Sequence, residues 1–260
     1  MKHVLTVQDL SCLGKCSLTV ALPVLSAAGC SCSVLPTAVL STHTAFPHPH
    51  VRELTADMPR IAAHWQTIGA AFDAILVGYL SDPAQMKEVA ALWDSFEGLR
   101  ILDPAMGDHG KLYSRITDAH VAAMRQLCAR ADLLIPNVTE ACFLTDTPWE
   151  HRGQHRKLIE KLRALGAKQV VLTGVSLSPG KTGFLTGDGY VYQTELLPGS
   201  YHGTGDLFAA VCTGMLMRGK SLTDSARLAA AFVEKTILAT GEASPFGLNF
   251  ESQLPTLAFL

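Results

Sequence analysis

Two glycines and an aspartate stand directly before an apolar segment late in the chain. The run reads His202-Gly203-Thr204-Gly205-Asp206, and apolar residues follow it. Glycine lets the backbone take positive φ and approach a ligand closely, and the first N–H groups of a helix are unpaired at its positive end. These N–H groups could hold phosphoryl charge while Asp206 takes a proton from an attacking hydroxyl, which is the chemistry of phosphoryl transfer. Aspartate is also a common helix cap, so the pattern alone leaves a purely structural role open.

Two further elements could serve the same chemistry. Asn137-Val138-Thr139-Glu140 begins a helix after a strand, where Asn137 and Glu140 fit a capping box. Glu140 could instead lie near Mg²⁺, which prefers oxygen ligands and keeps several waters. The segment 103–113 starts at Asp103, ends at Tyr113 and is rich in glycine and charge. It predicts either a mobile flap over a nucleotide or a solvated loop.

Several classes of protein are excluded by what the sequence lacks. It contains neither a G-x-x-x-x-G-K-[ST] loop nor a G-x-G-x-x-G turn after its first strand. The His-rich stretch 41–50 has no metal-ligand spacing and is interpreted as a polar loop. Seven cysteines without a C-x-x-C pair predict free thiols rather than a disulfide framework.

Bulk composition narrows the class further. The 260 residues carry a net charge of −2 with 17% charged residues, which suits a large core and gives no nucleic-acid footprint. We expect no membrane span, and the first residues resemble a strand rather than a signal peptide, so a cytoplasmic location is expected.

Strand-like and helix-like segments alternate along the chain. Strands are predicted at 3–8, 33–40, 74–78, 100–102, 133–135 and 169–173, and Pro36 is expected at a bulge or an edge. Helices are predicted at 15–28, 51–71 with a break at Pro59, 84–96, 118–131, 151–165, 206–218 and 223–240. Segments 182–186 and 190–194 form a hairpin. This order predicts an α/β fold in three layers over one domain, 1–260: a mainly parallel central sheet flanked by helices, with a late antiparallel edge hairpin.

Polar residues follow the end of each predicted strand. They are Gln8-Asp9, 41–44, Gly78-Tyr79, Asp103-Pro104, Pro136-Asn137 and Thr173-Gly174. Ligands bind beyond the carboxyl ends of strands in such sheets. The sequence therefore predicts a cleft at this end of the sheet.

Taken together, these residues resemble the ribokinase-like superfamily, and most closely its pyridoxal kinases. The resemblance rests on 203–210, on Asp103-Pro104 and on Asn137-x-x-Glu140. Supporting pieces occur in the family's order from residue 3 to about 240: Val7-Gln8, Thr37, Ser41-x-His43-Thr44, Gly78-Tyr79-Leu80, Ala131-Asp132-x-x-x-Pro136-Asn137 and Val170 to Thr173. The resemblance implies ATP- and Mg²⁺-dependent phosphorylation of the 5′-hydroxymethyl group of pyridoxal, pyridoxine or pyridoxamine by a homodimer. The need for a monovalent cation stays open.

The resemblance also implies roles for individual residues. Asp206 would be the base, and the N–H groups of Gly203, Thr204, Gly205 and Asp206 would form the anion hole. Glu140 and Asp103 would handle Mg²⁺ and phosphate. The ATP side would be lined by Asp103, Tyr113, Asn137, Glu140, Thr173 and Gly174. The acceptor would be held by Asp9, Ser11, Val39, Thr44 and Tyr79.

The first strand departs from the family pattern. Pyridoxal kinases usually have Gln-Ser there, whereas this chain has Gln8-Asp9 followed by Leu10-Ser11. An ionised carboxylate only accepts hydrogen bonds, so Asp9 could accept from the phenolic OH of the ring or from a protonated ring nitrogen. A hydroxymethylpyrimidine or another hydroxymethyl heterocycle is therefore an alternative acceptor. A non-catalytic binding protein on this scaffold is a third hypothesis, which the retained Asp206, glycines and Glu140 disfavour.

Overall fold

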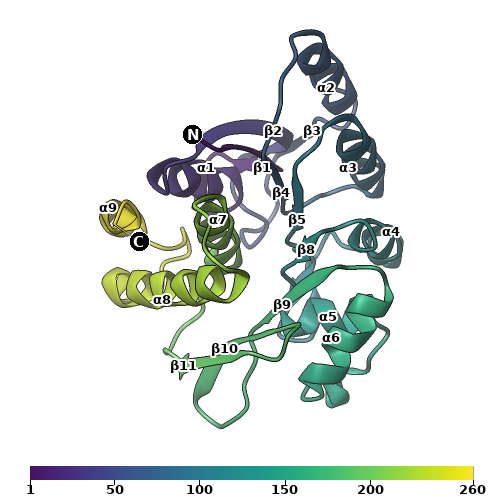
Figure 1. Cartoon of the computed structure of the whole chain (residues 1–260). Coiled ribbons are helices and arrows are strands. Elements are labelled where there is room, and N and C mark those ends of the chain that lie inside the picture. The colour runs from purple at the N-terminus through teal and green to yellow at the C-terminus, as the bar shows by residue number, and fades with distance from the viewer. Residues whose placement is uncertain (260) are drawn as a thin grey trace.

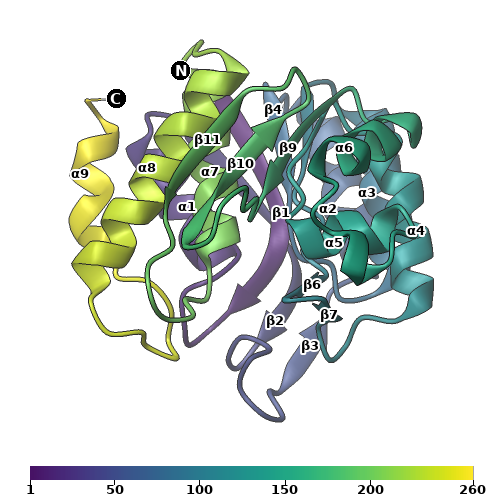
Figure 2. The same cartoon turned by 90° about the horizontal axis from the view of Figure 1, so that it is seen from below.

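The computed structural model describes residues 1–259, which form a nine-stranded sheet between two layers of helices (Figures 1 and 2). The strand order is β11-β10-β9-β8-β5-β4-β1-β2-β3. These strands are β1 (His3–Ser11), β2 (Ser31–Leu40), β3 (Val51–Glu53), β4 (Ala74–Val77), β5 (Leu99–Leu102), β8 (Leu133–Leu134), β9 (Gln169–Thr173), β10 (Lys181–Thr186) and β11 (Val191–Glu195).

The sheet is parallel in its centre and antiparallel at both edges. Strands β2, β1, β4, β5, β8 and β9 pair in parallel. The hairpin of β10 and β11 continues the sheet antiparallel beyond β9, and β3 pairs antiparallel with β2 at the other edge. The predicted α/β fold with a late edge hairpin is confirmed. The antiparallel strand β3 was not predicted.

Helices cover both faces of the sheet, as Figure 1 shows. One layer holds α1 (Leu18–Ala27), α7 (Thr204–Met217), α8 (Leu222–Thr240) and α9 (Leu254–Leu257). The other holds α2 (Met58–Thr67), α3 (Pro83–Ser95), α4 (Asp118–Cys128), α5 (Val138–Leu144) and α6 (His155–Ala164). Alternate residues of β4 enter different cores: Leu76 packs on the α1–α7 side and Ile75 on the α2–α6 side. This alternation is why the central strands are apolar on both faces.

The helix predicted over 51–71 is wrong in its first part. Residues Val51–Glu53 are strand β3, and the helix begins only at Met58. Pro59 lies in the first turn of α2, where a missing N–H costs no hydrogen bond, so it starts this helix rather than breaking it.

Three other predictions are corrected or completed. Strand β1 runs to Ser11 instead of stopping at residue 8, and its register with β2 shifts between Gln8 and Leu10, beside Pro36. The expected bulge near Pro36 is therefore present. The helix predicted from residue 151 begins at His155, after a short 3₁₀ turn at Trp149–His151. The segment 103–113 contains a small hairpin, β6 (Gly107–Asp108) with β7 (Lys111–Leu112).

The topology places a ligand site at the end of β1. Strand β1 pairs with β2 on one side and with β4 on the other, and α1 and α2–α3 leave on opposite faces. A crevice forms outside the carboxyl ends of the strands where the chain switches direction in this way. In Figure 2 the β6–β7 hairpin lies at the same end of the sheet. Among residues 1–259, no helix is both long and apolar enough to cross a bilayer.

Candidate active site

The turn before α7 has the geometry of an anion cradle. Gly203 precedes the helix with φ of 83°, and a Cβ atom there would lie 2.5 Å from the carbonyl oxygen of Lys15. Only glycine fits a left-handed position so close to another backbone segment. The N–H of Leu207 bonds to the carbonyl of Gly203 at 2.9 Å, so the N–H groups of residues 204–206 precede the helical ladder. Unpaired N–H groups at the positive end of a helix favour bound phosphate.

Asp206 is the third residue of α7, and the cap residue is Gly203. The interpretation of Asp206 as a simple helix cap is therefore wrong. Burial raises the pKa of Asp206 to about 6, the negative charge of Asp9 adds to this rise, and a hydrogen bond from the backbone of Ser17 opposes it. A base is most effective when its pKa lies near the working pH, so this carboxylate is suited to take a proton.

The segment before α1 is a part of the site that the sequence did not indicate. Ser17 is buried and has φ of 48°, an uncommon conformation for a residue with a side chain, and its backbone reaches Asp206. Cys16 lies near Asp206 and Asp9: burial raises the pKa of its thiol, and the charges of these two carboxylates raise it further. Cys16 is therefore a neutral thiol that lies close to both carboxylates. The one local sign of this turn in the sequence was the glycine at position 14, which takes φ of 99°.

Asp103 lies next to the anion cradle, at the end of β5. Its Oδ2 atom is 3.7 Å from the point where a Cβ of Gly205 would stand. Burial raises the pKa of Asp103 well above its usual value, and the charge of Asp206 raises it further. Two carboxylates so close together in a buried place repel each other, so the site is electrostatically incomplete without a cation or bound protons.

Glu140 joins this acidic group from the start of α5. Its Oε2 accepts the N–H of Asn137 at 2.8 Å and its Oε1 accepts the N–H of Met106 at 3.1 Å. Burial, followed by the charge of Asp103, raises the pKa of Glu140 well above its usual value. Asn137 completes a capping box, because its Oδ1 accepts the N–H of Glu140 at 2.9 Å. The capping box is confirmed, and the same contacts hold Glu140 close to Asp103.

The remaining residues predicted for the ATP side lie around this group. The Nδ2 of Asn137 donates to the carbonyl of Gly107 at 2.9 Å, which ties α5 to the β6–β7 hairpin. Tyr113 follows the hairpin and is 37% exposed; the partial burial of its side chain, together with the charges of Glu140, Asp108, Asp103 and Asp206, raises its pKa. Thr173 bridges to Asn137 at the end of β9, and Gly174 follows with φ of 70° and open space where a Cβ would stand. The structure thus brings these residues together.

Asp9 and Tyr79, two of the residues predicted for the acceptor side, lie at the ends of β1 and β4. Because β1 continues to Ser11, Asp9 and Ser11 lie in the strand, and the Oγ of Ser11 donates to Oδ2 of Asp9 at 3.0 Å. Burial raises the pKa of Asp9, while hydrogen bonds from Ser17 and Ser11 lower it. Tyr79 is 7% exposed, and its hydroxyl has no hydrogen-bond partner among residues 1–259.

Val39 and Thr44 are less closely tied to this group. Val39 pairs with Leu10 in the β1–β2 ladder, one residue from Asp9. Thr44 lies in the loop after β2, and no side-chain hydrogen bond joins it to Asp9 within the described part of the chain. Its neighbour His43 is buried and bonds to the carbonyl of Pro245 at 2.7 Å, and its ring lies 4.8 Å from the tilted ring of His202. This ring contact connects the loop after β2 to the anion cradle, and no local pattern predicted it.

The donor set fits a magnesium ion that is shared with a phosphate. Within residues 1–259, no three His, Cys, Asp or Glu side chains are placed to hold a metal ion by themselves. Mg²⁺ commonly needs only one or two carboxylates, with water and substrate phosphate completing its shell. Asp103 and Glu140 supply two buried carboxylates beside the anion cradle. The residues therefore fit Mg²⁺ together with nucleotide rather than Mg²⁺ alone.

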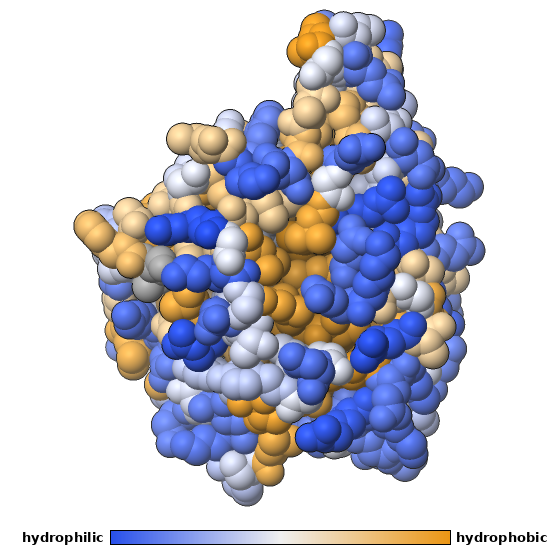
Figure 3. All heavy atoms as spheres, viewed as in Figure 1, coloured by the Kyte–Doolittle hydropathy of each residue, from blue (hydrophilic) through white to orange (hydrophobic). Residues whose placement is uncertain are grey.

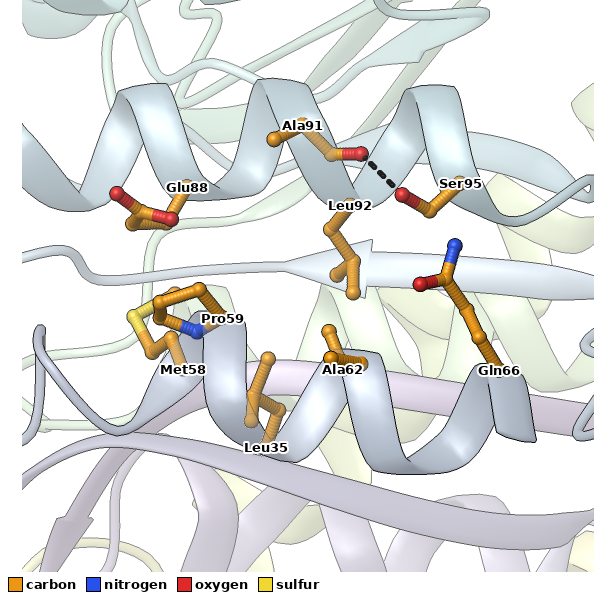
Figure 4. A pocket seen from close by; sticks show the side chains of 10 residues that line it. Leu35, Met58, Pro59, Ala62, Gln66, Glu88, Ala91, Leu92 and Ser95 are labelled. Atoms are coloured by element: carbon orange, nitrogen blue, oxygen red, sulfur yellow. Dashed lines mark hydrogen bonds between the residues drawn. The ribbon is translucent and has the colours of Figure 1, made fainter. Parts of the chain in front are cut away.

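The surface shows other hollows that lie apart from these residues. Figure 4 shows the side chains that line a pocket between α2 and α3. The pocket has a volume of about 100 Å³ and is lined by Leu35, Met58, Pro59, Ala62, Ala63, Gln66, Glu88, Ala91, Leu92 and Ser95. None of the predicted site residues lines it. In Figure 3 apolar atoms gather in a band over the central sheet, between more hydrophilic borders formed by the helical layers.

Comparisons with known proteins agree with this fold. The family model for phosphomethylpyrimidine kinase matches residues 22–248. A Bacteroides thetaiotaomicron protein described as a phosphomethylpyrimidine kinase has a TM-score of 0.93 and 35% identity, with 98% of this chain and 93% of that chain covered. Another crystal form of that protein is described as containing pyridoxal.

Proteins named as pyridoxal kinases are similarly close. The pyridoxal kinase from Lactobacillus plantarum has a TM-score of 0.91 and 33% identity, over 99% of this chain and 96% of that chain. The pyridoxine/pyridoxal/pyridoxamine kinase of Bordetella avium is 30% identical over 273 aligned positions, which cover 98% of this chain and 91% of the relative. The chain belongs to the phosphomethylpyrimidine kinase family and, within it, groups with the pyridoxal kinases, so it is a kinase with an alcohol acceptor.

Proposed function

We propose that this protein phosphorylates the 5′-hydroxymethyl group of a B6 vitamer with ATP and Mg²⁺. The observation that carries the proposal is the placement of Asp206: a partly buried carboxylate with a pKa of about 6 stands in the first turn of α7, directly after the anion cradle. Phosphoryl transfer needs little more than this, since catalysis lies mainly in positioning and in charge stabilisation. The similarity to pyridoxal kinases supplies the acceptor class.

The roles of the residues follow from their positions. Asp206 accepts the proton of the acceptor hydroxyl while the oxygen of that hydroxyl attacks the γ-phosphorus of ATP. The bond between the γ-phosphorus and the β–γ bridging oxygen breaks, and ADP leaves. The N–H groups of residues 204–206 hold the charge that develops on the phosphoryl oxygens. Mg²⁺, when bound, would neutralise phosphate charge beside Asp103 and Glu140. Tyr113, Asn137, Thr173 and Gly174 are proposed to line the nucleotide side.

The acceptor would bind between the ends of β1, β2 and β4. Asp9 and Ser11 offer oxygen atoms from β1, and Tyr79 offers a buried hydroxyl from the end of β4. Val39 and Thr44 are proposed to contact the ring from the β2 side. Transfer of the phosphoryl group requires the acceptor hydroxyl to lie in line, next to Asp206.

A hydroxymethylpyrimidine is the second candidate acceptor. Asp9 supports it, because a carboxylate at this position can accept a hydrogen bond from an exocyclic amino group. The matching family model, which is named for phosphomethylpyrimidine kinase, supports it as well. A kinetic comparison of the two acceptors separates them: faster turnover of the aminopyrimidine alcohol than of any vitamer would favour this second reading.

Several further expectations stay predictions. They are the single kinase domain over 1–260, the homodimer, the cytoplasmic location and the need for a monovalent cation. Size-exclusion chromatography with light scattering would test the dimer, and turnover with K⁺, Na⁺ or neither would test the cation.

A further inference from the structure

The β6–β7 hairpin is fastened to the start of α5. Asn137 and Glu140 hold its first strand through the hydrogen bonds described above. At the tip of the hairpin, the N–H of Gly110 bonds to Oγ1 of Thr139 at 3.0 Å, and Thr139 is buried in α5. In Figure 2 strand β6 lies beside α5. The same helix start therefore carries Glu140 and sets the position of the hairpin.

The tip of the hairpin packs against the indole ring of Trp149. His109 and Gly110 form its two-residue turn with φ of 51° and 79°, and positive φ at both positions is typical of such a turn. A Cβ atom at Gly110 would lie 2.8 Å from Cε2 and 2.9 Å from Cδ2 of Trp149. Only glycine lets the backbone lie this close to the ring. Gly110 and Trp149 thus form a close contact between the hairpin and the 3₁₀ turn after α5.

Trp149 is held by contacts of its own segment. The guanidinium carbon of Arg152 lies 4.8 Å from the centre of the indole ring, and Nη1 of Arg152 donates to the carbonyl of Trp149 at 3.1 Å. A cation over an indole ring is attracted to it, which restricts both side chains. The N–H of Thr147 bonds to the carbonyl of Cys142 at 2.9 Å and ties this segment to α5. The ring therefore has a fixed place beside the hairpin.

We propose that Trp149 is a positioning residue for the nucleotide side, because its indole ring holds the tip of the β6–β7 hairpin against α5. Met106, whose N–H bonds to Glu140, directly precedes β6. A displaced hairpin would move this donor and release the carboxylate from one of its two hydrogen bonds. Segment 103–113 then forms a preset wall of the nucleotide site rather than a flap that closes over it. The inference rests on the proposed function for the ligand, a nucleoside di- or triphosphate.

Ordinary surface packing by an aromatic residue would behave differently, and the chain offers two matched controls. Trp65 on α2 is also partly buried, and its ring lies 5.8 Å from that of Phe72. Trp65→Ala therefore removes an indole ring from another helix. Gly69 has φ of 68° and no atom within 4 Å of a Cβ. Gly69→Ala therefore introduces the same kind of backbone strain as Gly110→Ala without a contact to a ring.

The test measures nucleotide binding apart from turnover. Calorimetry gives the Kd for ADP with Mg²⁺, steady-state kinetics give the KM values for ATP and for the acceptor that the wild type uses, and amide hydrogen exchange reports on residues 106–113. We expect Trp149→Ala to raise Kd for ADP and KM for ATP about fivefold, as for the loss of an aromatic packing contact, while KM for the acceptor changes less than about twofold. Exchange at 106–113 becomes faster. Trp149→Phe recovers part of the loss, and Trp65→Ala changes none of these quantities.

A second pair of variants tests the contact itself. Gly110→Ala should weaken ADP binding more than Gly69→Ala, because its Cβ would overlap the indole ring. This excess should shrink when Gly110→Ala is combined with Trp149→Ala, since residues in contact are not additive.

An unchanged Kd for ADP or unchanged exchange at 106–113 in Trp149→Ala would overturn the inference, as would an equal loss for ATP and acceptor, which indicates a general structural role. If Trp149→Ala does not fold, Trp149→Phe and the pair Gly110→Ala and Gly69→Ala carry the same comparison. If the wild type binds ADP but phosphorylates none of the acceptors, the proposed function fails and the Kd values for ADP still decide. If the wild type binds no ADP and has no kinase activity, the proposed function and the inference fail together.

Discussion

Replacement of Asp206 by asparagine should stabilise the protein while it abolishes activity. Asparagine keeps the shape of the side chain and can still accept the backbone hydrogen bond from the Ser17 segment. It removes a partly buried negative charge near Asp9 and Asp103. Natural active sites often retain such unfavourable charges for function, so their removal increases the free energy of unfolding.

The magnitude follows from the shift in pKa. The pKa of Asp206 rises from 3.8 to about 6, and each unit corresponds to about 1.4 kcal/mol. Asp206 therefore binds its proton more tightly in the folded state than in the unfolded state. Above pH 6 the ionised carboxylate lowers the free energy of unfolding of the wild type, and this loss of stability becomes smaller as the pH falls toward 4. We expect Asp206→Asn to be more stable than the wild type by about 3 kcal/mol at pH 8 and by about half of that at pH 5.

Urea unfolding of both proteins at pH 8 and pH 5 measures this difference in the free energy of unfolding. Thr256→Ala, a substitution on α9 and far from the active site, serves as the control variant. In parallel, kcat should fall at least about 10²-fold in Asp206→Asn, because the base is lost. Asp206→Asn with wild-type activity would refute the assignment of the base. A stability difference that does not depend on pH would refute the argument from the buried charge.

Three further predictions concern the same site. For the wild type, kcat/KM should rise with pH through about 6, as Asp206 loses its proton, and a flat profile between pH 5 and 7 would contradict this. Gly203→Ala should lower kcat/KM at least about tenfold, because the new Cβ would lie 2.5 Å from the carbonyl oxygen of Lys15 and the backbone there is left-handed. Gly205→Ala should fold normally, because the new Cβ would contact only Asp103, at 3.7 Å. Circular dichroism separates folding from activity. Asp9→Asn should change the ranking of acceptors by KM and leave KM for ATP unchanged; an unchanged ranking would remove Asp9 from specificity.

Residues whose role depends on local chain geometry could be predicted from the sequence. A few consecutive residues determine each of three such features: the turn at 203–206, the capping box of Asn137 and Glu140, and the late hairpin. Glycine spacing, cap chemistry and strand alternation act over this range. The central strands were found for the same reason, because burial on both faces leaves a short continuous apolar run.

Contacts between distant segments could not be predicted in this way. Arg115 and Glu53 are 62 residues apart, and their meeting depends on the short edge strand β3, which the helix-like pattern of 51–71 concealed. The backbone of Ser17 reaches Asp206 only because α1 and α7 pack on the same face of the sheet. Tertiary packing decides such contacts, and local propensity carries little information about them.

ADP release from ATP and Mg²⁺ is measured with pyridoxal, pyridoxine, pyridoxamine or hydroxymethylpyrimidine as the acceptor, in the wild type and in Asp206→Asn. We expect selective turnover of a B6 vitamer by the wild type and a loss of at least about 10²-fold in the variant. Turnover of the pyrimidine alone would contradict the vitamer as substrate, and no turnover of any of the four by folded wild-type protein would contradict the proposed function.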